Sequence, residues 1–261
     1  MNVSLVDSHC HIPMIEGLGT SKDIIGDALA NGVEHMLCVS IDLESYPDIL
    51  ELARQFDTVS ASVGVHPNTD KECDASVDSL VNLAGESCVV AIGETGLDYF
   101  RSEGDLEWQR QRFRNHIRAA RETGKPLIIH SREAREDVIN ILREEKADEV
   151  GGVMHCFVDD YETAEKAMDL NFLISFSGIV TFKNAQELKE VARRVPVSRL
   201  LVETDSPYLA PVPYRGKTNR PAFVRHVAEH IAELKGCEFS EIAVASTENF
   251  YRLFFPGRQA G

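Results

Sequence analysis

Short apolar stretches typical of buried β-strands recur along this chain of 261 residues, and segments with helical spacing separate them. The stretches are "VSLVDSH", "VEHMLCVS", "TVSASVGVH", "CVVAIGETG", "PLIIHS", "GGVMHCF", "NFLISFSG" and "RLLVETDS". Helical spacing predicts helices over 20–31, 44–56, 74–86, 105–123, 133–146, 160–170, 184–194, 219–235 and 240–253. Continuous apolar strands that alternate with helices indicate parallel strands buried on both faces.

Eight strand–helix units in about 250 residues match the size of a (β/α)8 barrel, or TIM barrel. The competing architecture is a doubly wound open sheet, which usually carries a glycine-rich dinucleotide loop. No such loop follows an early strand, and we find no linker, repeat or low-complexity tract. We therefore predict an α/β fold with one (β/α)8 barrel domain over residues 1–261.

The composition narrows the possible partners. The chain has 27 lysines and arginines against 42 aspartates and glutamates, a net charge of −15, which argues against non-specific binding to nucleic acid. A local site that handles phosphates stays possible. The six cysteines form no CxxC pair and indicate no disulfide framework. Without a signal peptide or a membrane-length apolar run, we expect a cytoplasmic protein with no membrane partner.

Histidines and carboxylates gather where the predicted strands end. In the first stretch, His9 and His11 are two residues apart, so on a strand they would lie side by side and form half of a metal site. The other strand ends carry His66, Glu94, Asp98, His130, His155, Glu203 and Asp205. A barrel places all of these ends on the face where barrel enzymes build their active sites. The remaining histidines fall elsewhere: His35 opens the second strand, and His116, His226 and His230 lie on predicted helices.

The types of ligand limit the metal. Imidazole with carboxylate suits Zn, Mn, Fe or Ni, whereas Mg prefers shells made only of oxygen. Four histidines and two carboxylates exceed the needs of one tetrahedral ion, but two ions that share a carboxylate would use them all. We predict two divalent cations, with Zn, Mn, Mg, Fe and Ni all left open.

Several motifs closely resemble those of the TatD family of metal-dependent hydrolases, within the amidohydrolase superfamily. They are "DSHCH", "GVHP", "GETGLDY", "VMHCF", "ISFSGIVTF" and "VETDSPYLAPVPYRGKTNRP". The resemblance extends from about residue 5 to "NFYRLF" near the C-terminus. It implies a TIM barrel of the metal-dependent hydrolase type, one or two divalent metals, and deoxyribonuclease activity of the 3′→5′ exonuclease or repair type.

The resemblance also implies a role for particular residues. By this resemblance, one metal ion would bind His9, His11 and Asp205. The second ion would bind His130 and His155, and Glu94 would bridge the two. Related amidohydrolases often have a carboxylated lysine at the fourth strand, where this chain has Glu94 and no nearby lysine. The resemblance places His66 beside the substrate phosphate, although a structural turn before Pro67 is an alternative interpretation.

The mechanism that follows is a hypothesis. Two metal ions would lower the pKa of a water molecule, and Asp205 would accept its proton as the general base. The metals and His66 would then stabilise charge on the phosphoryl oxygens.

A basic segment suggests an anionic substrate. Residues 211–228 contain Arg215, Lys217, Arg220 and Arg225 and no acidic residue. Arg101, Arg132 and Lys183 lie on other loops of the same face, where Tyr99, Phe100, Phe157 and Tyr214 could stack on bases. A solvated helix start and simple loop packing are equally good interpretations. We predict DNA, as single strands or 3′ ends, as the substrate.

Two rival functions stay open. The same site could hydrolyse a small cyclic amide, a lactone or a phosphate ester, because activated water also attacks carbonyl groups. A metal-stabilised scaffold without catalysis is less consistent with the sequence, since a structural site is closed and needs only four ligands. No obligate protein partner is visible in the sequence.

Overall fold

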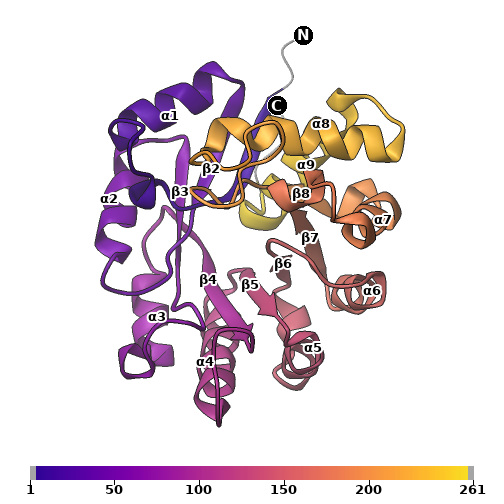
Figure 1. The fold of residues 1–261 in the computed structure, drawn as a ribbon. Helices are drawn as coiled ribbons and strands as arrows, with labels where there is room; N and C mark the ends of the chain where they lie inside the picture. Colours follow the sequence, from indigo (N-terminus) through magenta and orange to yellow (C-terminus); the bar gives the residue numbers. More distant parts are fainter. Residues whose placement is uncertain (1–3, 258–261) are drawn as a thin grey trace. The chain divides into compact units, whose positions relative to one another are not determined.

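A computed structural model describes residues 4–257. Its eight strands form one sheet in the order β1 to β8, and helices alternate with them along the chain (Figure 1). The strands are β1 Leu5–Cys10, β2 Val33–Cys38, β3 Val59–Val63, β4 Val89–Asp98, β5 Leu127–Arg132, β6 Gly152–Met154, β7 Phe172–Phe176 and β8 Leu200–Val202. This sequential parallel order confirms the (β/α)8 fold class and excludes the doubly wound sheet.

The chain divides into two compact units. The first unit comprises Met1–Cys38 and Ile174–Gly261, and the second comprises Val39–Leu173. The helices of the first unit are α1 Ser21–Ala30, α7 Gln186–Arg194, α8 Val224–Lys235 and α9 Phe239–Phe254. Those of the second are α2 Tyr46–Gln55, α3 Val77–Leu83, α4 Glu107–Thr123, α5 Arg135–Glu144 and α6 Tyr161–Asp169. A single domain over residues 1–261 stays a prediction.

Local signals set most helix ends. At the start of α1, Thr20 and Asp23 form a capping box in which each side chain accepts from the other's backbone N–H. At its C-terminal end, α4 stops before Gly124, which has a φ of 66° and matches the predicted stop signal. No helix among residues 4–257 combines the length and the apolar character that crossing a membrane requires.

Two elements near the C-terminus differ from the prediction. The helix expected over 219–235 is a 3-10 turn, Pro221–Phe223, followed by α8. Asn219 lies outside it because its amide Nδ2 donates to the carbonyl oxygens of Thr204 and Tyr208. Strand β8 ends early at Val202, and Asp205 beyond it has a φ of 54°, a left-handed conformation that no strand accommodates.

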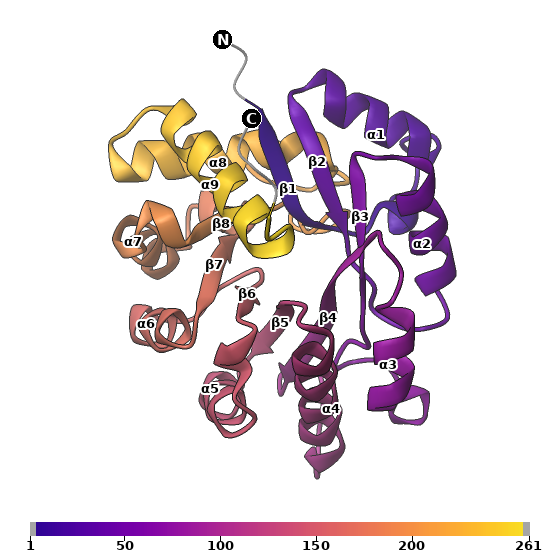
Figure 2. The same cartoon turned by 180° about the vertical axis from the view of Figure 1, so that it is seen from behind.

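In the first unit, helix α9 packs on β1 and β8 (Figure 2). Buried polar side chains of α9 support the short strand β8. The Ser246 hydroxyl accepts from the backbone N–H of Val202 at 3.1 Å, and Asn249 Nδ2 donates to the Leu200 carbonyl oxygen at 2.8 Å. These contacts hold the strand from which the Asp205 loop departs.

In the second unit, strands β4 and β5 approach closely beside the candidate site. Gly96 is the register partner of His130 and has a φ of 133°. A Cβ atom at this position would overlap the carbonyl oxygen of His130. Glycine is therefore required for β4 to bring Glu94 within reach of β5.

We expect Gly96→Ala to lower the free energy of unfolding by at least about 2 kcal/mol, because overpacking and a strained φ act together. Chemical denaturation would measure this loss. Gly26→Ala on α1 is the matched control, since a Cβ atom there meets nothing within 4 Å. Equal stability of the two variants would contradict the close approach of β4 and β5.

Candidate metal centre

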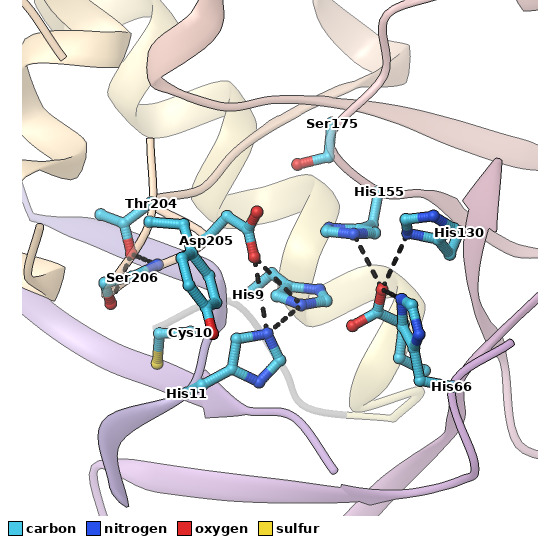
Figure 3. A network of polar contacts seen from close by, with 12 residues as sticks. His9, Cys10, His11, His66, His130, His155, Ser175, Thr204, Asp205 and Ser206 are labelled. Atoms are coloured by element: carbon cyan, nitrogen blue, oxygen red, sulfur yellow. Dashed lines mark hydrogen bonds and ion pairs between the residues drawn. The ribbon is translucent and has the colours of Figure 1, made fainter. Parts of the chain in front are cut away.

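The first cluster of candidate ligands lies in the first unit, at the ends of β1 and β8. His9 Nε2 and His11 Nε2 are 3.2 Å apart, and Asp205 Oδ1 lies 3.8 Å from the former and 3.5 Å from the latter. The three side chains point toward one another (Figure 3). The two histidines are therefore side by side, as the strand spacing predicted.

Backbone hydrogen bonds join β1 to the loop after β8. The N–H of Asp205 donates to the His9 carbonyl oxygen at 2.9 Å, and the N–H of His11 donates to the Ser206 carbonyl oxygen at 2.8 Å. These two bonds pair the segment 9–11 with 205–206 and hold all three candidate ligands in one place.

Hydrogen bonds between Asp7 and Thr204 also hold β1 and the loop after β8 together. Both the backbone N–H and the hydroxyl of Thr204 donate to Asp7, at 2.8 and 2.5 Å. Burial raises the pKa of Asp7 well above its usual value, although the two Thr204 bonds oppose that shift. Neither residue was assigned a role from the sequence, which offers no signal that residues 197 positions apart make contact.

The second cluster lies in the second unit and surrounds Glu94. Glu94 Oε1 lies 3.1 Å from His130 Nδ1, 3.1 Å from His155 Nε2 and 3.2 Å from His66 Nε2. Burial alone would raise the pKa of this carboxyl, but the three imidazoles hold it well below its usual range. Glu94 is therefore a buried carboxylate surrounded by three imidazole rings.

The two nitrogens of His130 face two carboxylates. Its Nε2 lies 3.2 Å from Asp98 Oδ2, while Nδ1 faces Glu94. Burial disfavours charge on this ring, but the bonds to Asp98 and Glu94 prevail and raise its pKa. A histidine whose second nitrogen donates to a carboxylate is the usual arrangement of a metal ligand, because the carboxylate fixes the tautomer and the ring orientation.

His66 presents its other ring nitrogen to Glu94: Nε2 faces the carboxylate here, whereas Nδ1 does so in His130. Its Nδ1 accepts the backbone N–H of Asn68 at 3.0 Å, so neutral His66 carries its proton on Nε2, the atom that faces Glu94. Burial outweighs the nearby carboxylate and lowers the pKa of His66, which favours this neutral form. In this tautomer Nε2 donates a hydrogen bond and is not a metal donor, although His66 lies close enough to Glu94 and His130 for the three to share an ion.

One buried polar face of helix α4 positions these groups. The Arg112 guanidinium, 1% exposed, pairs with Asp74 and donates to the carbonyl oxygens of the loop that carries His66. Gln109 accepts the N–H of Asp98 at 3.1 Å and donates to the Pro67 carbonyl oxygen at 3.1 Å.

His116 completes this face. Its Nε2 accepts the N–H of Val65 at 2.9 Å, next to His66 in the chain, and its Nδ1 donates to the Arg112 carbonyl oxygen. The sequence assigned His116 to a helix and gave it no further role. A helical pattern cannot distinguish such a polar interior face from a solvent-exposed one.

Both clusters have the donor atoms and spacing of a metal site. Two ligands of one tetrahedral zinc ion, each about 2.0–2.1 Å from it, lie roughly 3.3 Å apart. The nitrogen–nitrogen distance between His9 and His11 is 3.2 Å, and Glu94 lies at 3.1 Å from each of His130 and His155. Imidazole and carboxylate suit Zn, Mn, Fe and Ni.

The structure shows which of the basic and aromatic residues noted in the sequence are paired or buried and which are accessible. Some cations of 211–228 are paired with acids, because Arg220 lies 3.4 Å from Asp27 and Arg225 lies 2.7 Å from Glu229. Phe157 is buried, as loop packing would require. Phe100 is 56% exposed, so its ring is accessible to a base, and Tyr99 and Tyr214 are partly exposed.

Comparison with known proteins assigns the family. The family model described as "TatD related DNase" matches residues 6–255. The chain belongs to the TatD family of metal-dependent hydrolases. The sequence resemblance to this family is thus confirmed over nearly the whole chain.

Individual relatives agree with this TatD assignment. The chain is 50% identical over 253 residues to YcfH, an uncharacterized metal-dependent hydrolase of Escherichia coli K12, covering 96% of this chain and 95% of that protein. It is 43% identical over 251 residues to YabD of Bacillus subtilis 168, covering 96% and 98% of the two chains. The crystal structure of the TatD homolog YJJV from Escherichia coli K12 superposes with a TM-score of 0.89 and 27% identity, covering 97% of this chain and 99% of that chain.

Thr204→Val should weaken binding of a divalent metal by the cluster of His9, His11 and Asp205 about 10- to 100-fold, because the hydroxyl bond to Asp7 that helps to hold the loop after β8 is lost. Competition with a zinc-binding dye would measure the affinity. Thr204→Ser keeps the hydroxyl and should restore most of it. Wild-type affinity in Thr204→Val would contradict this positioning role.

Burial lowers the pKa of His116 to about 4, so the unfolded chain takes up a proton first as the pH falls. Its contribution to stability is complete above about pH 6.5 and decreases toward pH 4, by up to about 3 kcal/mol. We expect His116→Gln to remove this part of the pH dependence. Urea denaturation at several pH values would measure it, and an unchanged slope would contradict the prediction.

Proposed function

We propose that this TatD-family protein is a metal-dependent deoxyribonuclease of the 3′→5′ exonuclease or repair type. The match to the family model supports this substrate class. The observation that carries the proposal is Asp205, a carboxylate whose side chain is 15% exposed beside His9 and His11, which are 1% and 5% exposed. An acid that is partly exposed in an otherwise buried cluster suits proton transfer from water.

We propose that each cluster holds one divalent cation. His9, His11 and Asp205 form one set of donors, and Glu94, His130 and His155 form the other. The residues of both sets lie in the carboxyl-terminal halves of strands or in the loops that follow them, at the end where (β/α)8 proteins carry their active sites. When bound, such cations supply Lewis acidity that activates water and polarises the phosphoryl group. The bridging role of Glu94 and the identity of the ions stay predictions.

Asp205 acts as the general base in this proposal. Its backbone N–H is fixed to His9 and its carbonyl oxygen accepts the N–H of Tyr208 at 2.9 Å, so the carboxylate has a defined direction. It orients the attacking water and accepts its proton. Its left-handed backbone suits aspartate and asparagine equally well, which makes asparagine a conservative replacement.

His66 acts as a hydrogen-bond donor to the substrate. The proton on Nε2, set by the Asn68 N–H on Nδ1, lies 3.2 Å from Glu94 Oε1, so it would become available to a substrate oxygen when Glu94 binds a cation in place of this hydrogen bond. A neutral donor fixed in advance stabilises negative charge that develops on a phosphoryl oxygen. This tautomer supports the substrate-facing role predicted for His66.

Asp205→Asn should reduce cleavage of single-stranded DNA by about 10²- to 10⁴-fold, the usual contribution of a general base, while the fold stays intact. A 5′-labelled oligonucleotide would reveal stepwise shortening from the 3′ end. Metal analysis of the same samples would show whether the ions are retained.

Asp57→Asn is the matched control, because Asp57 is exposed and far along the chain from every candidate ligand. It should cleave DNA at the wild-type rate. An active, metal-replete Asp205→Asn protein would reject Asp205 as the base. Absence of cleavage by the wild type with any of the candidate metals would reject the nuclease and favour a small cyclic amide, lactone or phosphate ester.

A further inference from the structure

Guanidinium groups stack on aromatic rings at several places in this acidic chain, and most of these groups also meet a carboxylate. Arg110 stacks on Tyr99 at 5.5 Å and lies 3.3 Å from Asp137. Two others behave in the same way: Arg220 stacks on Phe223 and pairs with Asp27, and Arg225 stacks on Phe239 and pairs with Glu229. The charge of these arginines is therefore balanced within the protein.

Arg132 differs from this pattern. Its guanidinium lies 3.9 Å from the centre of the Phe100 ring, and within residues 4–257 it has neither an ion pair nor a hydrogen bond from its side chain. In a chain with 42 acidic residues, an arginine that stacks on a ring without a carboxylate partner retains its full capacity to bind an anion. Arg215, stacked on Phe182 at 3.8 Å, shows the same feature in the first unit.

The Phe100–Arg132 pair is connected directly to the candidate ligand His130. Arg132 lies two residues beyond His130 on β5 and is the register partner of Asp98. One oxygen of Asp98, Oδ2, meets His130 Nε2 at 3.2 Å, while the other, Oδ1, accepts the N–H of Phe100 at 3.1 Å. The Asp98 carboxylate therefore helps to position both the His130 ring and the backbone of Phe100.

Phe100 is suited to a ligand with a flat ring. It is 56% exposed, which is unusual for a phenylalanine whose loop is held by hydrogen bonds to Asp98. A phenyl ring stacks on any nucleobase, and a guanidinium binds phosphate oxygens in a bidentate manner. A base and a phosphate occur together in each nucleotide of a nucleic acid strand.

We propose that Phe100 and Arg132 form a nucleotide subsite beside the His130 cluster. Phe100 stacks on one unpaired base of a single-stranded nucleic acid, and Arg132 binds the adjoining phosphate. The proposal rests on the proposed nuclease function and goes beyond it by assigning a specific substrate contact. It also predicts a preference for single strands, because a base within a duplex cannot stack on a side chain.

Binding would be measured by fluorescence anisotropy in the Asp205→Asn background with Mn²⁺, which separates binding from cleavage. The probes are an oligothymidylate of about ten nucleotides, a length in the range of single-strand sites, and an abasic strand of the same length. Phe100→Leu should weaken oligothymidylate binding about tenfold and leave the abasic strand unaffected. Arg132→Gln should weaken both probes and reduce the salt slope of log K by about 0.7.

Arg110→Gln is the matched control, because Arg110 stacks on the neighbouring Tyr99 but is paired with Asp137. It should bind both probes like the parent. Thermal unfolding of every variant would confirm that each one is folded. Three results would each overturn the subsite. The first is binding by Phe100→Leu and Arg132→Gln within twofold of the parent, and the second is a loss of affinity in Arg110→Gln as large as theirs. The third is that the parent binds neither probe.

Cleavage by the wild type, assayed in parallel, distinguishes the two proposals. If the variants bind as expected but the wild type cleaves no oligonucleotide, the nuclease proposal fails and the subsite stands. If the wild type cleaves and the variants bind like the parent, only the subsite fails.

Discussion

The buried carboxylate of Glu94 is the constraint on which the candidate site of the second unit depends. A carboxylate removed from water is costly unless cations or hydrogen-bond donors surround it. Three imidazoles supply that environment, and the glycines of β4 allow the close strand approach that brings them together. Either a proton on His130 or a divalent cation balances the charge. Binding of a metal ion at this cluster would therefore release a proton.

Buried hydrogen bonds to backbone groups hold the candidate ligands in both units. In the second unit, Arg112, Gln109 and His116 of α4 bind the loop that carries His66. In the first, Asp7 and Thr204 join β1 to the loop after β8. Residues outside the two candidate ligand sets thus determine where the candidate side chains lie, because loop backbone has few other partners inside the protein.

The arginines that stack on aromatic rings fall into two groups, those paired with a carboxylate and those without such a partner. Most arginines that stack on rings also pair with carboxylates, as Arg110 does with Asp137, and so stabilise the protein surface. Arg132 and Arg215 stack on rings without such partners. A net charge of −15 opposes indiscriminate attraction of nucleic acid, so binding of the proposed substrate would depend on a few cations that no carboxylate neutralises.

The sequence by itself determined the (β/α)8 fold class, the family, and the side-by-side placement of His9 and His11, because strand and helix periodicity and short motifs are local properties. Only the tertiary structure decided which nitrogen of His66 and of His130 faces Glu94, that Asp98 orients His130, and that α4 has a buried polar face. It also decided which cations of 211–228 are paired with acids. These features depend on contacts between residues far apart in the chain, such as Asp7 with Thr204 and Val65 with His116, and no periodicity in the sequence encodes them.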